Sequence, residues 1–292
     1  MKNNENEQKN IYDKKALKGE NVAFETLRDK LGFRYCRTLR DLKFFKLLSA
    51  AKFGLVATKL DLAKDDKILD IGCFSGHILN RIHTEFKISG FGIDISKEAI
   101  NLAKRYDDFH NKYFVASAEK LPFPDNFFDG VISLDVLEHI EDKEKFVKEV
   151  LRVLKPKAWF LLYGVSDNYK YTFNWLRWKL SGKKVDYGYW KEAGHKEEFL
   201  INKDKLVKIS KNEIDNPEII YFHSFFTLIF DLYLARVLNK PINAFLKNKK
   251  TELHLNLYLL IYNFFLSFFT LLDKFWTKRG LANGFFYLGF KR

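Results

Sequence analysis

Between residues 67 and 165, short apolar runs alternate with stretches of helical periodicity, and no other feature of the sequence constrains the fold as strongly. Helical patterns cover residues 76–85, 97–106 and 142–154. Strands and helices that alternate at this spacing build a parallel sheet with helices on both faces. The apolar runs predict buried strands at Lys67–Ile71, Gly90–Asp94, Tyr113–Ala116, Phe128–Leu134 and Trp159–Val165.

The segment before this region has a different character. Residues 1–20 are polar and lack an apolar period, so we expect them to form a loose tail. Residues 21–62 carry apolar side chains at helical spacing with basic side chains between them. That pattern predicts an N-terminal helix packed on the domain behind it, or alternatively a basic lid or membrane-surface helix. We therefore divide the chain into residues 1–62, a core with a substrate cap at 63–217, and residues 218–292.

The last segment contains two further expected strands, Glu218–Phe226 and Gly284–Lys291, around an apolar insertion at about 227–283. Between Glu252 and Asp273, twenty residues lack Asp, Glu, Lys and Arg, a length that can span a bilayer. A single crossing is disfavoured, because both strands must return to one sheet and basic residues flank both ends of the run. We expect a helical hairpin in one leaflet, with a soluble helical subdomain or a homodimer interface as alternatives.

The charge and the cysteines narrow the classes of function. The chain has 50 Lys+Arg and 37 Asp+Glu, a net charge of +13, which indicates nucleic acid, an anionic membrane or a solvated surface as the partner. Much of the surplus lies between Arg236 and Arg292, beside the uncharged run, and this favours a membrane surface. Two cysteines cannot build a disulfide scaffold or a four-thiolate zinc site, and the polar start predicts a reducing cytoplasm.

The first predicted strand runs into a loop with glycines four residues apart, Gly72 and Gly76. Glycines between a strand and a helix let a ligand approach the backbone at the helix N-terminus. The spacing is not that of a dinucleotide fingerprint, since positions 74 and 77 are Phe and His. Asp70 ends the first strand region, and Asp94 ends the second strand, where a carboxylate can accept hydrogen bonds from ribose hydroxyls. Two strand-terminal acids favour a cofactor site over an empty turn.

Five segments then occur in the order of a known family: Ile68–Gly76, Gly92–Ser96, Ala118–Phe123, Phe128–Ile140 and Arg152–Pro156. Over residues 65–165 the chain resembles the class I S-adenosylmethionine-dependent methyltransferases, in the small-molecule type 11 branch. The resemblance implies an α/β, Rossmann-like, doubly wound sheet of seven mostly parallel strands in the order 3-2-1-4-5-7-6. Here that sheet would carry an N-terminal helical segment and a helical insertion between strands 6 and 7. S-adenosyl-L-methionine is the implied cofactor.

The resemblance also implies roles for individual residues. Asp70, Gly72 and Gly76 are expected along the methionine part of the cofactor, and Asp94 is expected to hold the ribose. Ile95, Ser117 and Ala118 are expected to border the adenine. Leu134 and Asp135 are expected near the sulfonium. The chain departs from the family where it carries Phe74 in place of glycine, Ser117 in place of an aspartate, and Lys157-Ala158 in place of a glycine pair. These changes leave the ribose acid and both flanking glycines, so we expect a competent cofactor site.

Two histidines are candidates for catalysis. Methyl transfer needs an aligned nucleophile and, for a hydroxyl acceptor, removal of a proton, which a neutral imidazole can take. His139 follows the fourth strand, and His195 lies in a G-H-x-x-x-F segment that resembles one over the acceptor site. The alternative is that each caps or orients a loop. No metal is the main prediction, with a divalent ion on Asp135, Glu138 and His139 as the alternative, by resemblance to ubiquinone-biosynthesis O-methyltransferases.

The sequence thus predicts O-methylation of a lipid, quinone or lipid-linked sugar by an enzyme peripheral on the inner face of the cell membrane. The alternative is a soluble small-molecule methyltransferase whose insertion serves dimerisation. A nucleic-acid methyltransferase is disfavoured, because Asp135-Val136-Leu137-Glu138 occupies the position where amino-methylating enzymes carry an N/D-P-P-[FYW] motif. No nucleic-acid partner is expected. A non-catalytic binding protein is supported only by Phe74 and Ser117.

Overall fold

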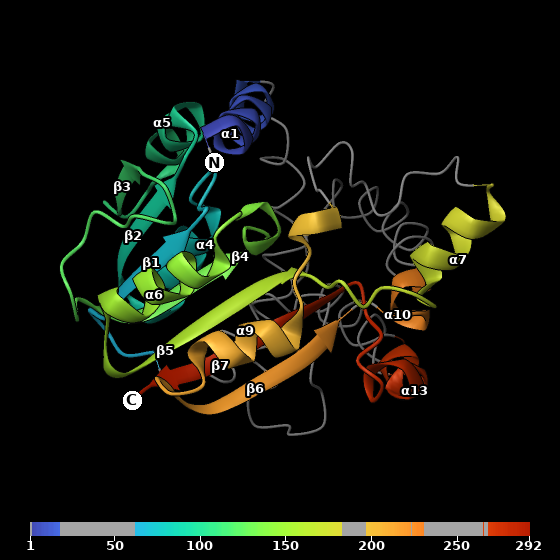
Figure 1. The fold of residues 1–292 in the computed structure, drawn as a ribbon. Coiled ribbons are helices and arrows are strands. Elements are labelled where there is room, and N and C mark those ends of the chain that lie inside the picture. Colours follow the sequence, from blue (N-terminus) through green and yellow to red (C-terminus); the bar gives the residue numbers. More distant parts are fainter. Residues whose placement is uncertain (1, 18–61, 183–196, 223, 231–264, 266–267) are drawn as a thin grey trace, which may run out of the picture.

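The computed structural model describes residues 2–17, 62–182, 197–222, 224–230, 265 and 268–292. These residues build a seven-stranded sheet in the order β3-β2-β1-β4-β5-β7-β6, which confirms the expected fold and strand order (Figure 1). Strands β1 to β5 run parallel, and β7 is antiparallel to both β5 and β6. The strands are β1 (Lys67–Ile71), β2 (Ser89–Asp94), β3 (Lys112–Val115), β4 (Phe128–Leu134), β5 (Leu154–Val165), β6 (Ile214–Phe222) and β7 (Gly284–Lys291).

Helices connect the strands, and several of them begin at a residue whose side chain accepts a hydrogen bond from the first turn. Ser96 accepts from the backbone N–H of Ala99, and Asp142 accepts from that of Lys145. Such caps satisfy N–H groups that have no partner within the helix. The helices are α1 (Lys2–Leu17), α4 (His77–Phe86), α5 (Lys97–Tyr106), α6 (Lys143–Val153), α7 (Phe173–Leu180), α9 (Lys203–Ser210), α10 (Phe226–Ile229) and α13 (Lys274–Thr277), with 3-10 turns at Leu137–His139 and Glu197–Phe199.

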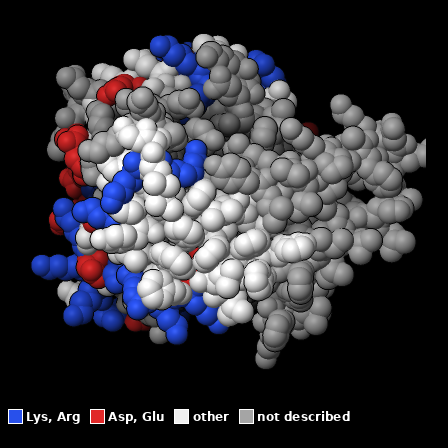
Figure 2. Space-filling view, turned by 90° about the vertical axis from the view of Figure 1, so that its right-hand side faces the viewer, with Lys and Arg blue, Asp and Glu red and all other residues white. Residues whose placement is uncertain are grey.

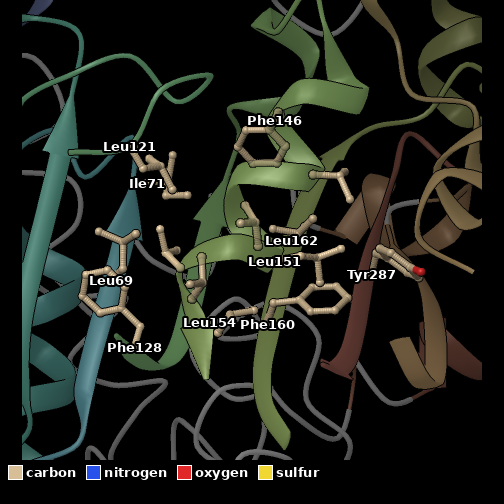
Figure 3. Close-up of a cluster of buried hydrophobic side chains, with 14 of the residues drawn as sticks. Leu69, Ile71, Leu121, Phe128, Phe146, Leu151, Leu154, Phe160, Leu162 and Tyr287 are labelled. Atoms are coloured by element: carbon tan, nitrogen blue, oxygen red, sulfur yellow. The ribbon is translucent and has the colours of Figure 1, made fainter. Parts of the chain in front are cut away.

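The core consists of two layers, one on each face of the sheet. Ile68 of β1 packs with side chains of α4 and α5, whereas Leu69 and Ile71 pack with those of α6 and α9. This division follows from the strand period of two, which sends successive side chains to opposite faces. Figure 3 shows the second layer, where Phe146 and Leu151 of α6 lie over side chains of β1, β4, β5 and β7.

The N-terminal residues differ from the expectation of a loose tail, which is wrong for Lys2–Leu17, because they form helix α1. Its inward side chains recur every four residues as Asn4, Gln8, Tyr12 and Ala16, and α1 packs against α5. A spacing of four places them on one helix face. Three of the four side chains are polar, so a search for an apolar period could not find this face.

The sixth strand also begins and ends earlier than predicted. β6 spans Ile214–Phe222 rather than Glu218–Phe226, with a bulge between Asp215 and Glu218, and Phe226 begins α10 instead. The bulge accommodates Pro217, which has no N–H for the ladder and is tolerated on an edge strand. The predicted boundary between residues 217 and 218 therefore falls inside a strand.

Two expected segments lie mostly outside the described ranges: the helix over 21–62, of which Leu62 alone is described, and the apolar insertion, of which 231–264 and 266–267 are outside. The described ends of the insertion form α10 and a helical stretch from 268 to 277 interrupted at Asp273. α7, α10 and α13 lie together at one end of the molecule, beyond β5, β7 and β6 (Figure 1). Among the described helices, none has both the length and the apolar character that a bilayer crossing requires.

Candidate functional site

The candidate site lies at the carboxyl ends of the parallel strands. The strand order runs from β1 through β2 to β3 on one side and from β4 to β5 on the other, so the winding direction reverses between β1 and β4. In open α/β sheets, ligands bind outside the carboxyl ends of the strands at such a reversal. The residues that follow β1, β2, β3 and β4 are therefore the ones to consider.

The loop after β1 requires glycine at two positions. Gly72 and Gly76 have φ angles of 77° and 72°, in the left-handed region that favours glycine. A Cβ atom on Gly72 would lie 2.2 Å from Cγ2 of Val136, and one on Gly76 would lie 2.5 Å from the hydroxyl of Tyr113. Both predicted glycines are therefore fixed by the turn and by its close approach to neighbouring side chains, which brings the backbone near any ligand at the sheet edge.

Asp94, at the end of β2, is held by two backbone groups. Its Oδ2 accepts from the N–H of Phe74 at 3.1 Å, and its Oδ1 accepts from the N–H of Ser96 at 2.8 Å. The side chain is only 8% exposed, and this burial raises the pKa of Asp94 to about 6, against the opposing effect of the two hydrogen bonds. The carboxylate is thus oriented before any ligand arrives.

Asp70 is a second buried carboxyl group, and on β1 it pairs in register with Gly92 of β2. Within the part of the chain that the structure describes, its Oδ2 has no hydrogen-bond partner. Burial, and then the charge of Asp94, raise the pKa of Asp70 well above its ordinary value. A buried acceptor without a partner costs free energy, about 1–3 kcal/mol, and a ligand that donates a hydrogen bond there removes that cost.

The other predicted cofactor residues lie at the same edge. The backbone N–H of Ala116 donates to the carbonyl of Asp94 at 3.0 Å, which brings the following Ser117 and Ala118 beside β2. The Ser117 hydroxyl accepts from the N–H of Glu119, and its O–H group can donate to a ligand. Leu134 ends β4, and Asp135 follows with a φ of 58°. A left-handed non-glycine residue is strained, and such strain is common at functional sites.

His139 lies in the 3-10 turn after β4 and contacts helix α1. Its Nε2 is 3.1 Å from the hydroxyl of Tyr12, in a hydrogen bond whose donor depends on the imidazole tautomer. The side-chain amide of Asn4 donates to the carbonyl of His139 at 3.1 Å. Burial raises the pKa of Tyr12, as do the charges of Glu138, Asp135 and Asp94, so the phenol stays protonated. Sequence reasoning missed Tyr12, because the helix face that carries it is polar and shows no apolar period.

The structure does not bring the alternative metal ligands together. His139 faces Tyr12, whereas Oε2 of Glu138 lies 3.0 Å from where a Cβ atom on Gly164 would sit, on the β5 side of the turn. In the described residues, no group of three or more His, Cys, Asp or Glu side chains is arranged to hold an ion. The set of Asp135, Glu138 and His139 therefore does not fit a shared metal. His195, the other catalytic candidate, lies outside the described residues.

Comparison with known proteins agrees with this geometry, because residues 69–162 match the model of a family described as a methyltransferase domain. Those residues are a class I S-adenosylmethionine-dependent methyltransferase domain of the type 11 branch. The domain thus contains β2, β3 and β4 and most of β1 and β5, with the loops that carry the candidate site. The resemblance inferred from the sequence motifs is confirmed.

Among curated relatives, the methyltransferase domain is 34% identical over 100 residues to norajmaline N-methyltransferase of Rauvolfia serpentina, covering 32% of this chain and 34% of that protein. It is 36% identical over 129 residues to the ubiquinone/menaquinone biosynthesis C-methyltransferase of Rickettsia bellii, covering 38% of this chain and 52% of that protein. The chain thus spans about a third to a half of the length of the curated relatives that it matches.

Among solved structures, the fold is similar to phosphoethanolamine N-methyltransferase 2 of Haemonchus contortus, in complex with phosphomonomethylethanolamine and S-adenosylhomocysteine. The TM-score is 0.54 at 18% identity, and the match covers 88% of this chain and 56% of that chain. At this identity the likeness concerns the fold. It extends well beyond the methyltransferase domain, whereas the sequence matches do not.

Proposed function

We propose that this chain is a methyltransferase that binds S-adenosyl-L-methionine at the carboxyl ends of β1, β2 and β4. The observation that carries the proposal is the orientation of Asp94 by the backbone N–H groups of Phe74 and Ser96, next to the glycine loop of a methyltransferase domain. A carboxylate held in this way can accept hydrogen bonds from both ribose hydroxyls of a nucleoside.

The remaining residues fit the same cofactor. The unpartnered Oδ2 of Asp70 would receive a donor from the methionine part, whose positive charge would also stabilise the buried carboxylate. Gly72 and Gly76 let the ligand lie against the backbone. Ile95 and Ala118 offer apolar contacts to the adenine, and the Ser117 hydroxyl offers a donor at its edge.

His139 is the residue that we assign to proton removal from the acceptor. When bound, S-adenosyl-L-methionine supplies an activated methyl group for in-line transfer. A hydroxyl or ammonium acceptor must lose a proton as it is methylated, and the imidazole of His139 can take it when neutral. Tyr12 and Asn4 hold this histidine from the α1 side, through its ring nitrogen and its carbonyl oxygen. His195 stays a second candidate for the same role.

Calorimetry with S-adenosylhomocysteine tests the cofactor site. We expect the wild-type chain to bind it, Asp94→Asn to weaken binding at least about tenfold, and Asp204→Asn to leave it unchanged. The tenfold figure corresponds to about 1.4 kcal/mol, the scale of a hydrogen bond to a charged group. Asp204 is a matched control because its carboxylate lies on the exposed surface of α9. Absence of binding by the wild-type chain at millimolar ligand would overturn the proposal.

For the acceptor, we propose a lipid, a quinone or a lipid-linked sugar reached from a membrane surface, with transfer to oxygen. The support is an exposed apolar stripe at the end of the insertion. Phe268, Leu271 and Phe275 are 50%, 54% and 54% exposed, and Leu272 is also exposed. Offsets of three, four and seven residues place these side chains on one face of a helix. The relatives are named for N-, O- and C-methylation, so their names do not choose the acceptor atom. The proposal of transfer to an oxygen atom of a lipid therefore depends on the histidines and on the exposed stripe.

Basic side chains accompany the stripe. Lys274, Lys278 and Arg279 follow it, and the guanidinium of Arg279 lies 3.8 Å from the ring centroid of Phe275. Figure 2, turned toward this end of the molecule, shows an uncharged area, and along one side of it Lys and Arg side chains with Asp and Glu side chains among them. Apolar side chains beside basic ones suit the boundary between acyl chains and anionic headgroups.

Flotation with liposomes of phosphatidylglycerol and phosphatidylcholine tests this surface. We expect the wild-type chain to float at low salt and the double variant Phe268→Ser with Leu271→Ser to stay in the soluble fraction. Val115→Ser is the control, because Val115 is an exposed apolar residue on the opposite edge strand, β3. If instead the double variant changes only the oligomeric state, the stripe is a dimer interface, and the soluble alternative replaces the membrane proposal.

The acceptor itself is tested with methyl-labelled S-adenosyl-L-methionine and total bacterial lipid extract. We expect label in an extractable lipid product whose methyl group is released under the conditions that cleave ethers or esters. Label transferred only to water-soluble amines or phenols would contradict the lipid proposal while leaving the methyltransferase proposal intact.

A further inference from the structure

Helix α1 contacts both of the residues whose backbone groups hold the carboxylate of Asp94. One of them, Ser96, donates its N–H to Oδ1, and the other, Phe74, donates its N–H to Oδ2. These two residues lie in different loops, after β2 and after β1. Their common neighbour in the structure is a helix more than fifty residues away in sequence, so the arrangement is a product of tertiary packing.

The contact with Ser96 is made by Asp13. The hydroxyl of Ser96 donates to Oδ1 of Asp13 and accepts from the N–H of Ala99, so it joins α1 to the first turn of α5. The N–H of Glu98 donates to the same Asp13 oxygen at 3.5 Å. Hydrogen bonds to a carboxylate are stronger than those between neutral groups, so this contact fixes the loop that presents the Ser96 N–H to Asp94.

The contact with Phe74 is made by Tyr12 and Ala16. The rings of Tyr12 and Phe74 lie with centroids 6.3 Å apart at 64°, and Phe74 packs on the cluster of Ala16 with Ala99 and Leu102. Phe74 has a φ of 43°, a left-handed conformation that is costly for a bulky residue. Packing against α1 offsets that cost and holds the Phe74 N–H on Asp94.

We propose that α1 is a clamp on the cofactor site, and that Asp13 is a positioning residue which acts on the cofactor through Ser96 and Asp94. The inference rests on the proposed function, since it takes the ribose of the cofactor as the ligand of Asp94. Cofactor binding and docking of α1 then stabilise each other. By linkage, the factor by which docking strengthens cofactor binding is the factor by which the cofactor strengthens docking.

Helix α1 also connects the cofactor site to His139, the residue assigned to the acceptor. Tyr12 lies next to Asp13 on α1, and its hydroxyl is hydrogen-bonded to Nε2 of His139. A cofactor that draws α1 onto the site therefore also sets the phenol against the histidine assigned to the acceptor. Cofactor and acceptor should therefore strengthen each other's binding.

Calorimetry and hydrogen–deuterium exchange on the full chain with S-adenosylhomocysteine test the clamp. We expect the ligand to slow amide exchange in residues 2–17 of the wild-type protein. Asp13→Asn should weaken ligand binding about fivefold or more, the lower end of typical coupling between sites, and should reduce the slowing in α1 by the same factor. Glu5→Gln removes one negative charge from an exposed position of the same helix and should change neither quantity.

A second variant, Ala16→Glu, forces a large charged side chain between α1 and α5 without touching the sheet core, and it should reproduce the effect of Asp13→Asn. The clamp is overturned if the wild-type protein binds S-adenosylhomocysteine without any change of exchange in α1, or if Asp13→Asn binds it within twofold of wild type. Failure of the wild-type protein to bind the ligand at all is a different result, which removes the proposed function and the clamp with it.

Discussion

At the scale of single residues, the site is defined by two buried carboxyl groups that have no Lys or Arg partner in the part of the chain that the structure describes. Asp70 and Asp94 end neighbouring strands, and burial raises the pKa of both. Among the described residues, no Lys or Arg contributes to either shift, so the charge that would balance them is expected from a ligand. An enzyme that binds a cationic cofactor benefits from such a site, because the ligand regains the free energy that burial cost.

The pKa of Asp94 predicts how stability and binding depend on pH. A carboxyl group with a pKa of about 6 when folded and 3.8 when unfolded binds more protons in the folded state between those values. Its contribution to stability is therefore present at low pH and is lost as the pH rises from about 4 to about 6, by on the order of 3 kcal/mol. Binding of S-adenosylhomocysteine, which requires the carboxylate, should weaken below pH 6.

Thermal unfolding of the ligand-free protein between pH 4 and 7 checks the stability effect. Relative to Asp94→Asn, the wild-type melting temperature should fall as the pH rises through this range, and Asp204→Asn should show the wild-type profile. A difference between wild type and Asp94→Asn that does not depend on pH would show that Asp94 ionises normally.

His139 predicts a second residue-scale result. His139→Gln should lower kcat for transfer of the labelled methyl group to the acceptor about 10²- to 10⁴-fold, because a positioned base contributes a factor of that size. Affinity for S-adenosylhomocysteine should change far less than kcat, because the residues assigned to the ribose and to the methionine part follow β1 and β2. His110→Gln is the matched control, because His110 lies exposed in the loop after α5. Equal activity of the two variants would assign the base to another residue, such as His195.

At the scale of elements, the loop after β1 and helix α1 show two ways in which the sequence specifies a site. The loop depends on backbone geometry, since Gly72 and Gly76 both occupy the left-handed region. The helix depends on side chains, since its inward face of Asn4, Gln8, Tyr12 and Ala16 meets the polar end of the site rather than an aliphatic core. The first is visible as a glycine spacing, and the second becomes visible only once its partner is known.

A comparison of Gly76→Ala with Gly182→Ala separates two costs to the free energy of unfolding: the steric clash of the new Cβ with a neighbouring side chain, and backbone strain at a positive φ. Both glycines have positive φ angles, 72° and 63°, but a Cβ on Gly76 meets the Tyr113 hydroxyl at 2.5 Å, while one on Gly182 has nothing within 4 Å. Gly182→Ala should cost about 1 kcal/mol of unfolding free energy from strain alone. Gly76→Ala should cost about 2 kcal/mol more and should weaken ligand binding. Chemical denaturation measures both, and equal losses would mean that Tyr113 moves aside freely.

At the scale of the whole molecule, the ends of the long insertion are tied together by one carboxylate. Asp273 is buried, and its Oδ1 accepts from the N–H groups of Phe225 and Phe226 at 3.1 and 2.8 Å. Its Oδ2 accepts from both the N–H and the hydroxyl of Thr227. The segment after β6 is thereby fastened to the segment before β7, although 46 to 48 residues separate them. This contact places the exposed stripe at a defined end of the fold.

Asp273→Ala should lower the free energy of unfolding by about 2–4 kcal/mol, because it leaves several buried donors without an acceptor. Asp273→Asn, which keeps one acceptor oxygen, should lose less. Asp204→Ala, at an exposed position, should lie within about 0.5 kcal/mol of wild type. Urea unfolding measures the free energy of unfolding of all three variants. The fraction of Asp273→Ala that floats with liposomes should also be lower than for wild type, because the stripe loses its support. If Asp273→Ala has the same free energy of unfolding as wild type, other contacts hold the two ends of the insertion together.

The sequence by itself indicated a parallel sheet and the glycines and acids at its carboxyl edge, and the strand order came from the resemblance to the methyltransferase family. Alternating apolar runs, glycine spacing and strand-terminal acids are local signals, and a strand with period two or a turn with positive φ leaves its mark in neighbouring residues. Only the tertiary structure decided that residues 2–17 form a helix and that this helix contacts Phe74, Ser96 and His139. Those outcomes depend on contacts between residues 4–16 and residues 74–139, and a polar face carries no period from which such a partner can be inferred.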